Sequence, residues 1–169
     1  MIQLSYDKAL AKAASLCSKS ERAPKEIFDK LMSWGISAKM AEQIVNYLRE
    51  ENFIEESRYA RAFVHDKFQY EHWGRLKITF ALHNKGISDA IVGNSIEEQI
   101  THDEYLSALI ELLKGKMRTM DMPLSQKDRS KLYRYATQKG FETSIIAQAL
   151  RNIGEDFEDI EDIEDIEEW

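Results

Sequence analysis

The 169-residue sequence predicts an all-α protein of three tandem three-helix repeats, which form an elongated, curved array, followed by an acidic C-terminal tail. Two observations predict this fold class. The chain has only seven Gly and two Pro residues, which suits long helices better than a turn-rich β-sandwich. A phrase centred on glycine also occurs three times, at residues 31–37, 82–88 and 136–143. Tandem helical units of this kind contact mainly their neighbours along the chain.

The repeated phrase predicts a corner between two helices. An aliphatic residue stands eight positions before each glycine, and an apolar residue comes directly after the glycine. The residues eight and four positions before the glycine share one helix face. The glycine takes the left-handed position after the helix, and the apolar residue folds back onto the last turn. A Ser or Thr then stands where the next helix needs an N-cap. The three corner glycines are Gly35, Gly86 and Gly140.

The repeats are expected at residues 1–56, 57–102 and 103–154, and the tail at 155–169. Within the first repeat Ala9, Ala13 and Leu16 share a stripe, and Pro24 suits the first position of a helix. Tyr59 and Phe63 share a stripe in the second repeat, and Leu106 and Leu109 do so in the third. Nine helices are expected, at residues 7–19, 24–33, 38–50, 57–70, 74–84, 88–100, 103–118, 125–138 and 143–153.

The net charge of −7 is distributed unevenly along the chain. Residues 155–169 hold ten acidic and no basic residues, so the three repeats together carry +3. In the tail, large apolar residues recur every third position between acidic pairs: Phe157, Ile160, Ile163, Ile166 and Trp169. Ten acids without a counter-charge favour a disordered, solubilising tail. The regular apolar spacing favours instead a tail that docks on a basic surface of this chain, of a second copy or of a partner.

The sequence offers no constellation for catalysis, a metal or a cofactor. Lys114-Gly115-Lys116 lacks the remaining residues of a phosphate loop, and the four histidines lack zinc-helix spacing. Cys17 lies on an apolar helix stripe. We therefore expect it to be buried as a small apolar side chain and not to act as a nucleophile. A single cysteine cannot form an internal disulfide, and neither a signal peptide nor a membrane span is found, so a cytoplasmic, non-enzymatic protein without membrane contacts is expected.

Basic residues gather in the second and third repeats, where aromatic residues are interleaved with them. Such side chains can form a stripe that follows phosphates or an acidic protein groove. They can equally be the solvated face that any helical protein has. The candidates for partner contacts are Arg58, Arg61, Lys67, Arg75, Lys77, Lys85, Lys127, Arg129, Lys131 and Arg134.

The second repeat resembles the signature of the RecX family, bacterial regulators of the RecA recombinase. The resemblance rests on residues 56–64, followed by Lys67, Gly74 and residues 85–87, and it extends over residues 7 to about 153. Three positions depart from the family pattern: Arg75 stands where many relatives have Pro, Lys67 where Arg is usual, and Tyr59 in place of Phe.

The resemblance implies a modulator that lies in the helical groove of the RecA filament on single-stranded DNA. It further implies suppression of strand exchange, ATP hydrolysis and co-protease activity. We also expect weak sequence-nonspecific contact with single-stranded DNA, and a monomer. A DNA-binding helical module that acts without RecA is the alternative. Residues 88–100, with acidic and no basic residues, would make a poor recognition helix. A hydrolase or nuclease would need a converging acidic or metal site, which the sequence lacks.

Overall fold

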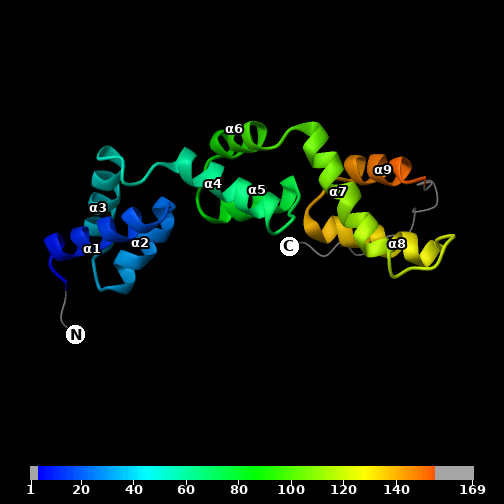
Figure 1. The fold of residues 1–169 in the computed structure, drawn as a ribbon. Helices are drawn as coiled ribbons and strands as arrows, with labels where there is room; N and C mark the ends of the chain where they lie inside the picture. Colours follow the sequence, from blue (N-terminus) through cyan, green and yellow to red (C-terminus); the bar gives the residue numbers. More distant parts are fainter. Residues whose placement is uncertain (1–3, 155–169) are drawn as a thin grey trace. The chain divides into compact units, whose positions relative to one another are not determined.

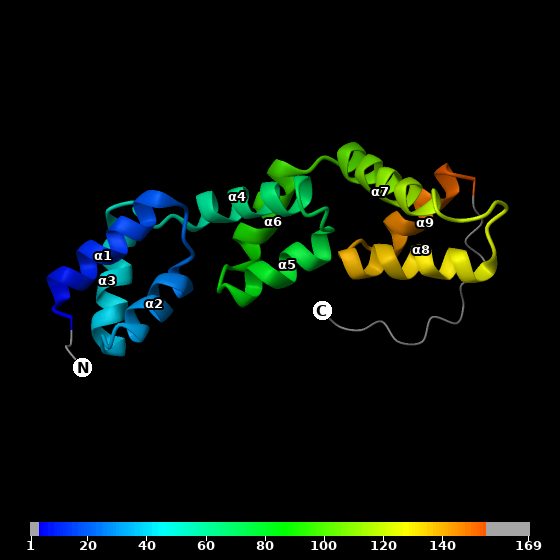
Figure 2. The ribbon, with the colours of Figure 1, turned by 60° about the horizontal axis from the view of Figure 1, so that its bottom comes forward.

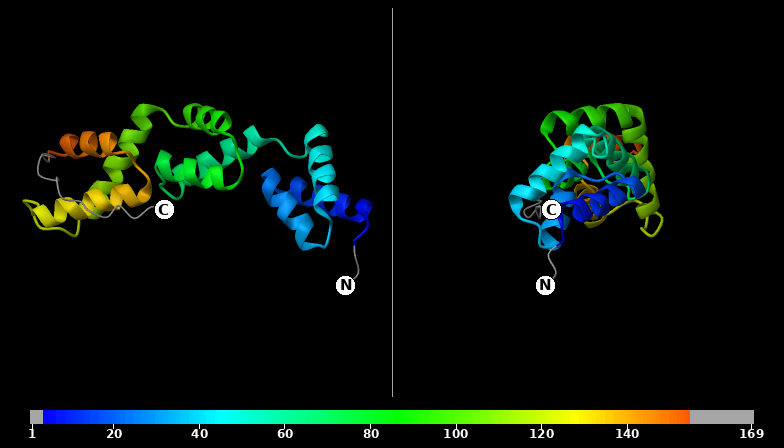
Figure 3. Two further views of the ribbon diagram at one scale, coloured as in Figure 1. Left: turned by 180° about the vertical axis from the view of Figure 1, so that it is seen from behind. Right: turned by 90° about the vertical axis from the view of Figure 1, so that its left-hand side faces the viewer.

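The computed structural model describes residues 4–154, and the predicted acidic tail lies outside this part of the chain. The regular structure of residues 4–154 is entirely helical, and both views in Figure 3 show only helices and their connections, so the predicted all-α fold class is confirmed. The helices, labelled in Figure 1, are α1 (Tyr6–Lys19), α2 (Pro24–Ser33), α3 (Ala38–Glu50), α4 (Glu56–Gln69), α5 (Arg75–Asn84), α6 (Asp89–Gln99), α7 (His102–Met117), α8 (Gln126–Lys139) and α9 (Thr143–Asn152). None of these helices is long and apolar enough to span a membrane.

The chain divides into two compact units. The first unit comprises the residues up to Phe63 together with Ala81–Ser95, and the second comprises Val64–Phe80 together with the residues from Ile96 onward. The helices of the middle repeat, α4, α5 and α6, therefore contribute residues to both units.

The core of the first unit forms where α1, α2 and α3 pack together (Figure 1). Each helix supplies apolar residues at spacings of three or four, which places them on one face. α3 begins with a side-chain cap, since the Ser37 hydroxyl accepts a hydrogen bond from the Met40 N–H at 3.3 Å. The buried residues include Ala9, Ala13, Ile27, Leu31, Ile44 and Leu48.

The second unit contains the group formed by α7, α8 and α9, which contact one another (Figure 2). α7 and α8 both begin with a capping box, Thr101 with Glu104 and Ser125 with Asp128, in which side chains satisfy the first N–H groups of the helix. The fully buried side chains here include Tyr105, Leu109, Leu113, Leu132 and Phe141.

The three corner glycines have the same backbone conformation. Gly35, Gly86 and Gly140 have φ of 81°, 78° and 96°, the left-handed conformation that the sequence predicts. At each corner the N–H after the glycine bonds to the carbonyl five residues earlier, as in Ile36 N–H to Leu31 O at 3.1 Å. Each corner is thus a Schellman motif, which satisfies the last carbonyls of one helix and turns the chain toward the next.

Candidate functional site

In the second unit the N-terminus of α5 meets the C-terminus of α8. The Gly74 N–H donates to the Lys139 carbonyl at 2.7 Å, and the Leu76 N–H donates to the Gly140 carbonyl at 3.0 Å. The first N–H groups and the last carbonyls of a helix lack partners within the helix. At this contact, N–H groups at the start of α5 therefore bond to carbonyls at the end of α8, and each helix end supplies the hydrogen-bond partners that the other lacks. We call this contact the α5–α8 junction.

A buried tyrosine completes the α5–α8 junction. Tyr105 on α7 is fully buried, and its hydroxyl accepts the Arg75 N–H at 2.9 Å and donates to Glu142 at 2.8 Å. Burial raises the pKa of Tyr105, so the hydroxyl keeps the proton that it donates. The Arg75 guanidinium lies over the Tyr105 ring, 4.0 Å from its centroid, and 3.5 Å from Glu142.

The junction requires glycine on both sides. A Cβ on Gly74 would collide with the carbonyl group of Gly140 and the backbone nitrogen of Phe141. A Cβ on Gly140 would collide with the backbone and Cβ of Lys77. This backbone-to-backbone approach places Lys139, at the end of α8, beside Lys77 in the first turns of α5.

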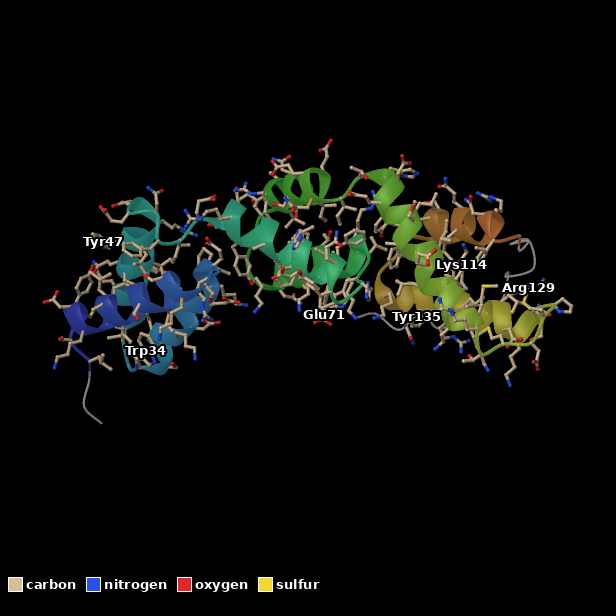
Figure 4. The ribbon with its side chains drawn as sticks, in the orientation of Figure 1. Trp34, Tyr47, Glu71, Lys114, Arg129 and Tyr135 are labelled. Atoms are coloured by element: carbon tan, nitrogen blue, oxygen red, sulfur yellow. The ribbon has the colours of Figure 1, made fainter. Side chains whose placement is uncertain are left out.

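Three lysines lie near the junction, and two of them contact the ring of Trp73, which precedes α5. The ammonium groups of Lys77 and Lys67 lie over the Trp73 ring, 4.6 Å and 4.8 Å from its centroid. Both distances suit cation–π attraction, which is strongest for tryptophan. The Lys139 ammonium donates to the Glu71 carbonyl at 3.2 Å, in the turn after α4 (Glu71 is labelled in Figure 4). We call Lys67, Lys77 and Lys139 with Trp73 the lysine cluster.

Positive charge is in excess at the lysine cluster. Burial and the neighbouring ammonium groups of Lys139 and Lys67 lower the pKa of Lys77, against an opposite effect of Glu71. Among the described residues, no carboxylate oxygen lies within 4.0 Å of the Nζ of Lys77 or Lys139. An anion that reached these two lysines would therefore meet ammonium groups that no described carboxylate contacts directly, although Glu71 acts on Lys77 from a greater distance.

Four of the ten candidate residues pair with carboxylates of this chain. Their distances range from 2.8 Å to 3.9 Å, and the side chains are partly exposed. Since each would have to exchange an internal partner for an external one, these residues are weaker candidates for contact with a partner. The pairs are Arg58 with Glu21, Arg61 with Glu55, Arg75 with Glu142, and Lys85 with Glu26.

Glu26 on α2 is the centre of a network in the first unit. Its carboxylate accepts hydrogen bonds from the Lys85 ammonium at 2.8 Å, the Tyr59 hydroxyl at 3.2 Å and the Ala23 N–H at 3.3 Å. Burial by itself would raise the pKa of Glu26, but the hydrogen bonds and the Lys85 charge lower it below its usual value. The network joins α2 to α4 and to the residue that follows α5, so Lys85 stabilises the first unit.

We expect Glu26→Gln to lower the free energy of unfolding at pH 7 by about 1 kcal/mol, because three donors lose a charged acceptor that is partly screened by solvent. A carboxyl with a lowered pKa contributes stability above its unfolded pKa of about 4.3, and this contribution is lost as the pH falls through the folded pKa. The difference between Glu26→Gln and the wild type should therefore shrink below about pH 4. Urea denaturation at several pH values measures it, with the exposed Glu42→Gln as control. A difference independent of pH would contradict this role of Glu26.

Three of the four candidates on α8 lie together on one exposed helix face. Lys127, Lys131 and Arg134 are spaced by four and three residues, so they share one face of α8, and all three are exposed. No carboxylate within residues 4–154 pairs with any of them. We call these three residues the α8 stripe. Arg129 lies off this face and donates to the Leu124 carbonyl at 3.4 Å.

The sequence did not single out two residues of the lysine cluster. Trp73 was one of several interleaved aromatics, and Lys139 was not among the ten candidates. The Trp-Gly pair before α5 was a possible signal for a close approach. The partner of that approach, however, lies in another repeat, and no local spacing connects Lys77 with Lys139.

Within residues 4–154, neither Cys17 nor the acidic side chains form a candidate nucleophile or metal site. Cys17 is partly buried, and burial raises the pKa of its thiol, which disfavours the nucleophilic thiolate. Over residues 4–154, no group of three or more His, Cys, Asp and Glu side chains is placed to hold a metal ion.

Comparisons with known proteins give one consistent result. The family model for the second three-helix domain of RecX matches residues 56–94, and the model for the third matches residues 103–150, together more than half of the chain. Regulatory protein RecX of Clostridium acetobutylicum is 28% identical over 151 residues, covering 88% of this chain and 70% of the relative. Regulatory protein RecX of Clostridium tetani is 27% identical over 152 residues, covering 88% and 68%.

Solved structures share the fold. The crystal structure of RecX from Lactobacillus salivarius aligns with a TM-score of 0.79 at 23% identity, covering 88% of this chain and 96% of that one. A second crystal structure, of regulatory protein RecX, aligns with a TM-score of 0.75 at 22% identity, covering 87% and 73%.

Proposed function

The chain belongs to the RecX family, and we propose that it regulates the RecA recombinase by binding the RecA filament on single-stranded DNA. In this proposal it is a cytoplasmic, monomeric protein that lies in the helical groove of the filament and inhibits strand exchange, ATP hydrolysis and co-protease activity. The observation that carries the proposal is the match of two RecX domains to α4–α9, the part of the chain that holds the α5–α8 junction, the lysine cluster and the α8 stripe.

The charge distribution supports this proposal. The second and third repeats carry net charges of +1 and +3, whereas the first carries −1. A filament groove on DNA presents phosphates and protein surface, and exposed lysines and arginines attract such a partner with an affinity that falls as salt rises. Contacts by several basic side chains on successive helices would give affinity without sequence specificity.

Cosedimentation with RecA filaments, together with RecA ATPase activity measured with and without this protein, tests the proposal. We expect the protein to sediment with RecA on single-stranded DNA and to lower the rate of ATP hydrolysis. A protein that stays in the supernatant and leaves the ATPase rate unchanged would contradict it.

A DNA-binding module that acts without RecA remains the second candidate, because the lysine cluster suits an anionic partner of either kind. α6 opposes direct groove reading, since the exposed Asp89, Glu97 and Glu98 would face phosphates. Equal affinity for bare and RecA-coated single-stranded DNA would favour this second candidate, and much tighter binding to the coated DNA would favour the first.

A further inference from the structure

We propose that the lysine cluster is a phosphate-binding site for the backbone of single-stranded DNA. This inference rests on the proposed function and assigns DNA, rather than RecA, as the partner of Lys67, Lys77 and Lys139. It also separates these residues from Arg58, Arg61, Arg75 and Lys85, which pair with carboxylates of the chain itself.

The lysine cluster is held in place by the fold. Lys77 lies where α5 packs on Gly140, and Lys139 is the last residue of α8, so both backbones are fixed by the hydrogen bonds of the α5–α8 junction. The Trp73 ring restrains the ammonium groups of Lys77 and Lys67, and the Glu71 carbonyl restrains that of Lys139. Lysine side chains lose about 2 kcal/mol of rotamer entropy when they are fixed. Restraint before binding lowers this cost for an incoming ligand.

The charge of the cluster selects an anion. An ammonium group has three N–H donors, and neither the ring contact of Lys77 nor the single carbonyl contact of Lys139 uses them all. The cluster brings three cations together, and Lys77 and Lys139 have no described carboxylate within 4.0 Å. A ligand with successive negative charges would relieve the repulsion among the three ammonium groups.

The type of cation favours phosphate over carboxylate. The planar guanidinium of arginine suits carboxylates, and Arg75 at the edge of the cluster lies beside a carboxylate, that of Glu142, at 3.5 Å. The cluster instead consists of lysines, which bind phosphates as point charges without a fixed orientation. A flexible single strand can adjust its phosphates to three such charges, and the contact would be independent of base sequence.

The test measures binding of the full chain to a fluorescein-labelled oligo-dT by fluorescence anisotropy at several salt concentrations. We expect Lys77→Gln with Lys139→Gln to weaken binding about tenfold at low salt. Loss of two phosphate contacts should also reduce the slope of log K against log salt by about 1.4, since each contact on a single strand contributes about 0.7. Trp73→Phe should weaken binding about two- to threefold and leave the slope of log K against log salt unchanged. It weakens the ring contact that restrains the lysine ammonium groups, but it removes no charge.

The matched control is Lys12→Gln in the first unit. The Lys12 ammonium lies over the ring of Trp34, 4.1 Å from its centroid, so it makes the same type of contact away from the lysine cluster (Trp34 is labelled in Figure 4). This variant should bind oligo-dT as the wild type does. In the wild-type protein, oligo-dT should protect Lys77 and Lys139, but not Lys12, from reductive methylation, and this result is independent of how the variants fold.

Unchanged affinity and slope in the double variant, or no protection of Lys77 and Lys139, would overturn the proposal. Unchanged oligo-dT binding together with weaker binding to RecA would also overturn it, and would assign the cluster to an acidic protein surface. Loss of oligo-dT binding in the double variant, in a protein whose wild type does not sediment with RecA, would support the phosphate site while contradicting the proposed function.

Discussion

Gly74→Ala is expected to lower the free energy of unfolding by about 3 kcal/mol. The new Cβ would collide with the Gly140 carbonyl group and the Phe141 nitrogen, which are backbone atoms that cannot rotate away. Overpacking of this kind costs about 1–3 kcal/mol. If α5 moves to relieve the collision, the hydrogen bonds from Gly74 and Leu76 to α8 are lost, at about 1 kcal/mol each. Urea denaturation followed by circular dichroism measures the change.

Gly93→Ala is the matched control for this prediction. Gly93 lies inside α6, where a Cβ would meet no atom within 4 Å, and its backbone is helical. Alanine should therefore stabilise the protein by about 0.5–1 kcal/mol, the usual gain from replacing glycine within a helix. If Gly74→Ala unfolds at the same urea concentration as Gly93→Ala, the α5–α8 junction does not contribute to stability.

The helices could be predicted because the signals that determine them are local. The stripe of Ala9 and Ala13, the corner at Gly140 and the cap at Thr101 each depend on residues within about two turns of one another. Such patterns specify where a helix begins, where it ends and which face it buries. Three similar corners in one chain also indicated the repeat.

The candidate site could be predicted only in part, since it depends on contacts between distant segments. Sequence spacing identified Lys67 and Lys77 as basic residues of one repeat, but it could not bring Lys139 beside them. It also could not distinguish Lys85, which pairs with Glu26, from Lys77, which has no described carboxylate partner. The sequence shows how many cationic residues each repeat has. Binding of a partner depends on which of these residues keep N–H donors that can contact it, and only the structure shows this.

The α8 stripe leads to the largest expected change in binding to RecA filaments. Changing Lys127, Lys131 and Arg134 together to Glu should weaken binding to RecA on single-stranded DNA about 100-fold at low salt. For charges about 8 Å apart in water each interaction contributes about 0.5 kcal/mol, so a change from attraction to repulsion costs about 1 kcal/mol per residue. Three such changes give about two orders of magnitude in affinity. The melting temperature should change little because the three side chains are exposed.

Three lysines of α1 provide the control for the α8 stripe. Lys8, Lys12 and Lys19 also share one exposed helix face, but they belong to the repeat with a net charge of −1. Their reversal to Glu changes the total charge by the same amount, so it corrects for the general attraction between the protein and DNA. Cosedimentation at two salt concentrations compares the two triple variants. If both weaken binding equally, only the total charge matters, and the α8 stripe is a solvated helix face rather than a contact with the filament.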